Sequence, residues 1–401
     1  MRYLGKNSIW FTVFLSSAVA LGPLATDMYL PTFPVLETLF SVSVSKVQWT
    51  LSVFMIGLAC FQLIVGPLSD RFGRKPVLFI GLLIFVASSY AAAQATSIEG
   101  LTIARFFQSI GVCTGVVIPR AMIRDLFERE MAARKLSRMG SIMGLAPAIA
   151  PVIGGYVAVH TGWPGIFLLL MIYGVLVLIL STLLIEESLK NKDHKAIHPA
   201  HILRNYSDLL SSWPFMGYAL TCAFCFSGFF AFISVSSHVL VSVMNVPIEQ
   251  FGYYFGCVVV GYISGTLLGP ILTSRFGLDT ALLLGTIASL LGAFLLCLFF
   301  YVDFQVPLAI ILPMILYDVG VGIVMPQSQA AAIHPFPEKA GAASALSGFL
   351  LLGLASLTGF LTAHFFTGSA FSLTVAVSVM GLMAFVICRL ASRKVVKRAV
   401  E

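Results

Sequence analysis

A short polar stretch between two long apolar runs constrains the fold of this chain most. It covers residues 66–76, reads Gly-Pro-Leu-Ser-Asp-Arg-Phe-Gly-Arg-Lys-Pro, and separates the apolar runs 47–65 and 77–95. A weaker copy with the same Gly-Pro and Arg-Phe-Gly frame occupies residues 269–277, and its Gly-Pro pair lies 203 residues (269 − 66) after the first. This offset is about half of the 401 residues, so the repeat predicts two similar halves in tandem.

The composition predicts a chain that crosses a membrane many times. It is 59% hydrophobic and 10% charged, whereas soluble domains are roughly 25% charged. The apolar runs are continuous rather than alternating, which favours helices over barrel strands. A spanning helix needs ~20 apolar residues. We therefore expect an all-α polytopic membrane protein with twelve transmembrane helices, near 8–30, 46–68, 77–95, 98–120, 137–159, 164–185, 214–241, 250–273, 279–300, 306–333, 342–366 and 369–391.

The positions of the charges predict the domains and the orientation. We expect two pseudo-symmetric six-helix bundles, 1–185 and 213–401, joined by a polar cytoplasmic linker, 186–212. With twelve spans both termini share a side, and nearly all Lys and Arg residues, including Arg2 and Lys6, fall on it. The positive-inside rule makes this side cytoplasmic. The net charge of +7 is then a topology signal and predicts no nucleic-acid partner.

The sequence offers little for catalysis or metal binding. No nucleophile–base constellation or metal-ligand cluster lies in the spans, and no G-x-x-x-x-G-K-[ST] motif for ATP is present, so we expect no enzyme and no cofactor. The linker carries His194, His198 and His201. They are compatible with a metal site, but an exposed linker is the favoured interpretation, and we expect no metal.

Three charges fall well inside predicted spans: Asp27, Arg105 and Asp318. An intramembrane charge is costly and marks a functional site by default. Asp27 and Arg105 are expected at similar depth, so they can pair across the bundle, either as a static bridge or as a pair that couples protonation to conformation. Asp318 lies near the midplane of a span rich in Gly and Pro, where secondary transporters bind substrates and ions, so it is a second proton or substrate candidate. Packing is the alternative for Asp318.

The fifth predicted span carries small residues and prolines at helical spacing. The pattern comprises Gly144, Pro147, Pro151, Gly154 and Gly155. Small residues permit close helix contact, and two prolines bend the helix. The pattern predicts either packing alone or a hinge or seal in a helix that moves.

Several motifs carry a family resemblance. Residues 66–75 resemble the signature loop between helices 2 and 3 of the major facilitator superfamily, and residues 105–109 resemble the Arg motif in the fourth helix of its proton-driven members. The fifth-span pattern resembles the drug-antiporter motif, with Ala150 in place of a Gly. Residues 26–31 (Thr-Asp-Met-Tyr-Leu-Pro) and 251–255 are most similar to the Bcr/CflA (bicyclomycin/chloramphenicol resistance) group of drug:proton antiporters.

This resemblance implies roles for particular residues. It implies two bundles that rock around a central cavity, with Asp27 binding protons, Arg105 tuning it, and Tyr29 and Gln108 as further proton-coupling or substrate residues. The gating hinge comprises Gly66, Asp70, Arg71, Gly73 and Arg74. Asp70 is expected to contact the start of the eleventh helix, near 339–341, and to hold the inner gate shut.

The resemblance also implies the activity. We expect a proton-coupled exporter of amphipathic drugs, monomeric, in the bacterial inner membrane, with the proton gradient as its energy source and a small molecule, protons and lipid as its partners. An exporter or importer of a specific metabolite or siderophore-type chelator is the alternative. A membrane sensor that does not transport is the third possibility.

Overall fold

The computed structural model describes residues 9–189, 192–193, 196–303 and 306–400, so Arg2, Lys6 and His194 lie outside the described residues. Within these ranges, twelve helices are long and apolar enough to cross a membrane. This confirms the prediction of an all-helical protein with twelve candidate spans.

The elements follow one another along the chain with short connections. The first part comprises α1 (Ile9–Asp27), η1 (Leu30–Thr32), α2 (Phe33–Phe40), α3 (Val44–Phe72), α4 (Arg74–Ala93), α5 (Ile98–Leu126), α6 (Arg129–Thr161) and α7 (Trp163–Leu184). The second part comprises α8 (Pro199–Leu210), α9 (Trp213–Ser237), η2 (His238–Val243), α10 (Ile248–Phe276), α11 (Leu278–Tyr301), α12 (Leu308–Ile333), η3 (Pro337–Lys339), α13 (Ala340–His364) and α14 (Phe371–Val400).

Three features differ from the sequence-based expectation. The first span is not one helix: α1 ends at Asp27, and a turn and η1 precede α2, because Pro31 cannot donate a backbone hydrogen bond. The fourth span continues to Leu126, six residues beyond its predicted end at 120. The polar linker is not only loop, since it contains α8.

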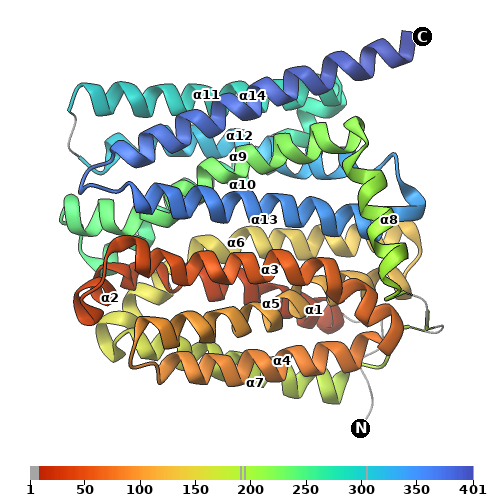
Figure 1. Cartoon of the computed structure of the whole chain (residues 1–401), viewed down its shortest axis with the longest axis horizontal. Coiled ribbons are helices and arrows are strands. Elements are labelled where there is room, and N and C mark those ends of the chain that lie inside the picture. Colours follow the sequence, from red (N-terminus) through yellow and green to blue (C-terminus); the bar gives the residue numbers. More distant parts are fainter. Residues whose placement is uncertain (1–8, 190–191, 194–195, 304–305, 401) are drawn as a thin grey trace.

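The helices lie roughly parallel in two groups (Figure 1). Helices α1 to α7 pack mainly on one another, as do α9 to α14, while α3 against α13 and α6 against α10 make the main contacts between the groups. The start of α1 and the end of α14 lie at the same end of the helices (Figure 1). The division into bundles 1–185 and 213–401 around a linker 186–212 stays a prediction.

The repeated motif has the same local structure in both copies. Helix α3 ends at Phe72 and α4 begins after Gly73, whose φ is +108°. In the second copy, α10 ends at Phe276 and α11 begins after Gly277, whose φ is +81°. Side chains other than Gly are strained at such φ values. Each Gly therefore permits a tight connection between two long helices.

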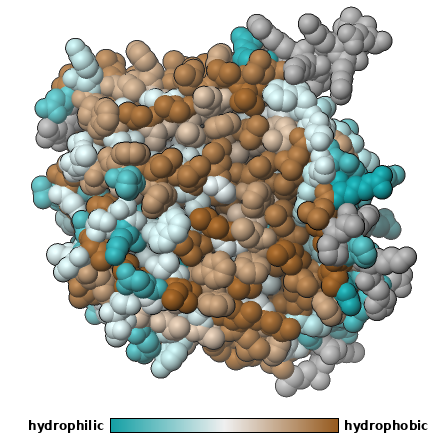
Figure 2. Space-filling model, in the orientation of Figure 1, coloured by the Kyte–Doolittle hydropathy of each residue, from teal (hydrophilic) through white to brown (hydrophobic). Residues whose placement is uncertain are grey.

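The surface between the helix ends is apolar. Figure 2 shows hydrophobic residues over the middle of the visible face and hydrophilic residues mainly towards the two ends. Large apolar side chains are widely exposed there, such as Ile172, Leu267 and Phe294, at 60%, 68% and 62%. A soluble protein rarely exposes so large an apolar surface. This surface is the one that contacts lipid.

Gly292 of α11 tests the packing between α11 and α12. A Cβ at this position would lie 2.7 Å from the Pro313 carbonyl oxygen, whereas a Cβ at Gly353 would meet no atom within 4 Å. Gly292→Ala should therefore destabilise the protein by about 1–3 kcal/mol through overpacking. Gly353→Ala should be neutral or stabilising, by up to ~1 kcal/mol, because Ala favours helix. Thermal unfolding in detergent measures both, and equal melting temperatures for the two variants would contradict this packing.

Candidate functional site

A cavity of about 830 Å³ lies between the two groups of helices. Its wall comes mainly from α3 and α5 on one side and from α12 and α13 on the other. It reaches the end of the molecule that carries Asp70, Arg74, Arg124 and Lys339, which we call the basic end. The other end, where Glu37 and His238 lie, is called the opposite end. We refer to the space as the central cavity.

Contacts between the two groups of helices close the opposite end. The Gln48 side-chain amide of α3 donates a hydrogen bond of 2.9 Å to the Ser234 hydroxyl of α9. The Ser356 hydroxyl of α13 donates one of 3.0 Å to the Ser52 carbonyl oxygen of α3. All four residues are buried. The central cavity is therefore accessible from the basic end and sealed from the opposite end.

The predicted fifth-span pattern, on α6, contributes to both regions. Gly144 and Pro147 line the central cavity. Gly154 lies directly against the Met28 backbone, and a Cβ at Gly155 would lie 2.9 Å from the Ile248 carbonyl oxygen.

Pro151 of the same helix packs with its backbone against Gly252 of α10. The small residues thus let α6 approach the turn after α1 and the start of α10 at backbone distance, as the predicted close contact requires.

The hinge loop is held by a network of charges. The Arg74 guanidinium bonds to Asp70 at 2.6 Å and to Asp125 at 2.9 Å. It also donates to the Ser69 hydroxyl at 2.6 Å. The remaining predicted hinge residues are spread around it: Gly66 lines the cavity, Gly73 makes the tight connection, and the Arg71 guanidinium lies over the Phe72 ring at 5.3 Å.

Sequence reasoning missed a carboxylate that caps this hinge. The Glu187 side chain accepts hydrogen bonds from the backbone N–H groups of Arg74 and Lys75, at 3.0 and 3.1 Å. The first N–H groups of a helix have no acceptor within the helix, and a negative charge at the start of α4 is therefore stabilising. Glu187 follows the sixth span, 113 residues after Arg74 (187 − 74), so no local signal connects it to the hinge.

The predicted gate contact between Asp70 and α13 is not made in this conformation. Asp70 and Gly341 both line the open cavity at the basic end. Asp70 is bonded to Arg74, while Lys339 at the start of α13 bonds to Asp208 of α8 at 2.6 Å. A gate that closes the basic end requires these groups to meet only when that end is shut, so this role stays a prediction.

The predicted Asp27–Arg105 ion pair is wrong for this conformation. The Arg105 guanidinium donates to the Ala25 carbonyl oxygen at 2.8 Å and to the Gln108 side-chain oxygen at 2.6 Å. Both groups are described, and no ion pair joins Asp27 to Arg105. The chain turns after Asp27, and the Asp27 carboxylate instead accepts a hydrogen bond from the neighbouring Thr26 hydroxyl at 2.8 Å.

Aromatic rings, rather than a carboxylate, surround the buried Arg105 guanidinium. Its guanidinium carbon lies 4.2 Å from the Phe54 ring centre, 5.0 Å from Tyr29 and 5.8 Å from Phe167. Such cation–π contacts are worth ~2 kcal/mol or more when desolvated. The structure thus brings three of the predicted coupling or substrate residues, Tyr29, Arg105 and Gln108, together in a cluster with no exposed surface, while their role stays a prediction.

Asp27 does not line the central cavity but bonds to a residue that does. Its side chain is buried, while its partner Thr26 is among the residues that line the cavity. Asp27 is also the last residue of α1, so the carboxylate sits where the first span is broken. The Thr26 side chain therefore lies between the cavity and the Asp27 carboxylate.

Asp318 occupies a separate site in the second group of helices. It is fully buried in α12, and neither carboxylate oxygen has a hydrogen-bond partner. Tyr262, which lines the cavity, lies within electrostatic range of it. A buried carboxylate without partners is costly in its charged form. The structure therefore does not join Asp318 to Asp27 in one site.

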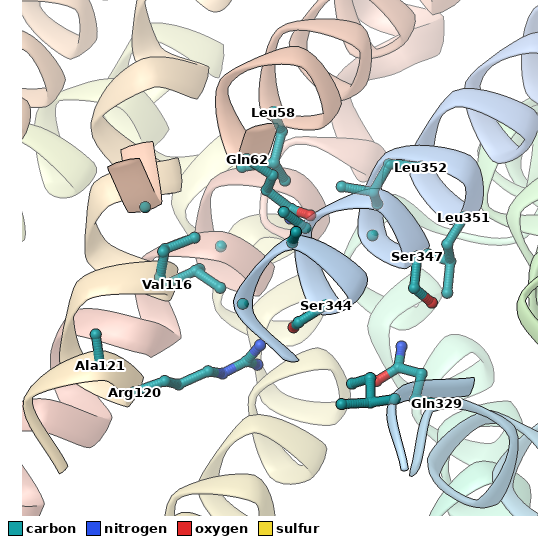
Figure 3. Close-up of a pocket in the computed structure, with 18 of the residues that line it drawn as sticks. Leu58, Gln62, Val116, Arg120, Ala121, Gln329, Ser344, Ser347, Leu351 and Leu352 are labelled. Atoms are coloured by element: carbon teal, nitrogen blue, oxygen red, sulfur yellow. The ribbon is translucent and has the colours of Figure 1, made fainter. Parts of the chain in front are cut away.

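The polar groups that line the cavity were not predicted. They include Gln62, Arg120, Gln329, Ser344 and Ser347 (Figure 3). The fourth span was predicted to end at Arg120, but α5 continues past it to Leu126. The sequence signal for the longer helix is weak, because Arg124 and Asp125 interrupt the apolar residues between Arg120 and Leu126. Among the described residues, no three His, Cys, Asp or Glu side chains are arranged to hold a metal ion.

Comparisons with known proteins give one family. Residues 15–360 match the Major Facilitator Superfamily. A bicyclomycin resistance protein homolog of Haemophilus influenzae is 30% identical over 360 residues, covering 89% of this chain and 90% of that protein. A chloramphenicol resistance protein of Pseudomonas aeruginosa is 27% identical and covers 88% and 85%. The inward-open structure of the xylose transporter XylE from E. coli shares the fold, with a TM-score of 0.76, 16% identity, and coverage of 95% of this chain and 94% of that one.

Helix α8 offers a test of the contacts at the basic end. The Lys339 ammonium lowers the pKa of the Asp208 carboxyl through a hydrogen bond. Because the pKa is lowered on folding, the contact is complete above the ordinary Asp value of about 4 and is lost as pH falls through the lowered value. Asp208→Asn should remove it at neutral pH and increase hydrogen exchange in 199–210.

Ser207→Ala is the matched control for this experiment, because Ser207 is exposed on the same helix. Unchanged exchange in Asp208→Asn would show that the ion pair does not hold α8.

Proposed function

This chain belongs to the major facilitator superfamily, and we propose that it is a proton-coupled exporter of amphipathic drugs that works by alternating access. The observation that carries the proposal is the central cavity, which is open at the basic end, sealed at the opposite end, and one hydrogen bond from the buried carboxylate of Asp27. A transporter of this fold needs a site between its halves that faces one side at a time.

The basic end faces the cytoplasm in this proposal. Arg71, Lys75, Arg124, Arg204 and Lys339 lie at this end, and the positive-inside rule assigns such an end to the cytoplasm. Both termini are then cytoplasmic, the two six-helix bundles are related by pseudo-symmetry, and the conformation is inward-facing. The protein resides in the bacterial inner membrane as a monomer.

The names of the related proteins favour drugs as the substrates. The two proteins compared above are named for resistance to bicyclomycin and to chloramphenicol. The cavity wall combines apolar side chains such as Leu58, Val116 and Leu351 with a few polar ones, which suits an amphipathic compound. A specific metabolite or chelator is the second candidate, and the amide and hydroxyl groups of the cavity are the observation that favours it.

Asp27 is the proposed coupling site, and its removal tests the mechanism. Asp27→Asn cannot release or bind a proton, so drug-dependent proton movement should fall at least tenfold. The measurement uses purified protein in liposomes with an internal pH dye, with chloramphenicol, bicyclomycin and an anionic chelator added in turn. Asp318→Asn is the matched control, since it neutralises the other buried carboxylate. Flux that persists in Asp27→Asn but is lost in Asp318→Asn would move the coupling role to Asp318.

Asp70 is proposed to hold the basic end shut in the outward-facing conformation. A carboxylate at a helix N-terminus contributes about 0.3–2 kcal/mol, so Asp70→Asn should slow transport severalfold without unfolding the protein. Glu128→Gln, an exposed carboxylate at the same end, should leave the rate unchanged. Transport rates at equal amounts of membrane-inserted protein give the comparison. A fully active Asp70→Asn protein would rule out this gate.

A further inference from the structure

Resting on the function proposed above, we infer that the central cavity selects amphipathic organic anions, and that the Arg120 guanidinium binds the anionic group. The expected substrates carry a carboxylate or a similar acidic group on an aromatic or aliphatic body. Arg120 is thus a specificity-determining residue, separate from the buried Arg105.

The first observation is the depth of Arg120 in the cavity. It lies six residues before the end of α5 at Leu126 (126 − 120), which corresponds to ~9 Å of helix. Ser344 of α13 and Gln329 of α12 each lie four residues from the basic ends of their helices, at Ala340 and Ile333. The three side chains therefore line the cavity at similar depth, from both groups of helices (Figure 3).

The second observation is where the negative charges lie. The described residues that line the cavity include four carboxylates, and all belong to its mouth: Asp70, Asp125, Asp193 and Glu338. Asp70 and Asp125 both bond to Arg74. Asp27 and Asp318 do not line the cavity. Farther from the basic end than the mouth, Arg120 is the charged group among the described lining residues. A guanidinium there attracts anions and repels cations.

The third observation is a polar group without a partner in the wall of the same cavity. The Ser347 hydroxyl is 98% buried (2% exposed), lines the cavity, and has no hydrogen-bond partner. A buried polar group without a partner is rare and needs an explanation. A bound acceptor group would satisfy it. Ser347 lies one turn from Ser344 on α13, and both serines line the cavity, with Ser344 on the side of Arg120 (Figure 3).

The residues farther in suit the apolar body of such a compound. Met55, Phe226, Phe229, Leu351 and Leu352 line the cavity. An amphipathic anion then lies with its acidic group towards Arg120 and its body among these side chains. Export of an anion from a cell whose interior is negative is favoured by the membrane potential, so anion selectivity is compatible with the proposed direction of transport.

Three probes with one fluorophore test the inference: dansylglycine is an anion, dansylamide is neutral, and dansylcadaverine is a cation. Equilibrium binding to the purified protein in detergent is measured by dansyl fluorescence, without a proton gradient. The wild-type protein should bind dansylglycine more tightly than dansylcadaverine. Arg120→Gln should weaken dansylglycine binding by about tenfold to a hundredfold, the effect of losing a charged hydrogen bond. Dansylamide binding should change little, which shows that the variant is folded.

Two further variants serve as controls. Arg120→Lys keeps the charge and should retain most of the anion preference. Arg275→Gln removes one positive charge from an exposed position at the end of α10 and should bind as the wild type does. Equal or tighter binding of the cation to wild type, or an unchanged preference in Arg120→Gln, would overturn the inference. Anion preference in a protein that moves no protons would support the inference and contradict the proposed antiport.

Discussion

Close backbone contact at the opposite end is the constraint on which the cavity depends. Gly155 of α6 and Gly252 of α10 lack the Cβ atoms that would separate these two helices, so the two groups of helices meet there at backbone distance. Helices that converge at one end diverge at the other, and the central cavity occupies the resulting space at the basic end. Polar contacts, such as the hydrogen bond from Gln48 to Ser234, also close this end. Each is weak on its own and can be replaced by other hydrogen bonds when the helices move. A moving transporter needs a closure of this kind rather than a continuous apolar core.

The buried charged residues differ in the partners that stabilise them. Arg105 is surrounded by aromatic rings and bonds to a carbonyl and an amide, so its guanidinium has several partners although none is a carboxylate. Asp27 has one hydroxyl partner, and Asp318 has none. The apolar surroundings therefore oppose the charged forms of both acids more than they oppose that of Arg105. Groups that gain and lose protons should have few fixed partners, so this difference is consistent with the coupling role proposed for Asp27 and with a structural role for Arg105.

Much of the fold could be predicted because its signals are local. Twelve apolar runs give twelve spans, and the repeated Gly-Pro and Arg-Phe-Gly frame appears as matching connections at Gly73 and Gly277. The site could be predicted only in part, since depth along a helix follows from residue counting but direction around it does not. Asp27 and Arg105 were assigned similar depth, yet a turn after Asp27 directs its carboxylate to Thr26. Arg120 was not predicted as a cavity residue, because the charged residues that follow it obscured the end of its helix.

Helix α8 connects the two groups of helices where they do not touch directly. The Tyr206 hydroxyl donates to the Leu63 carbonyl oxygen of α3, while Asp208 bonds to Lys339 beside α13. Tyr206 also lines the cavity, so α8 forms part of its mouth. Closing the basic end brings α3 and α13 together and must therefore break one of these contacts or move α8 aside. Lys339, at the start of α13, is bonded to Asp208 of α8 in this conformation. In the gate proposed above, Asp70 contacts this same end of α13, so α8 and the hinge would compete for it, and the position of α8 would depend on the state of the cavity.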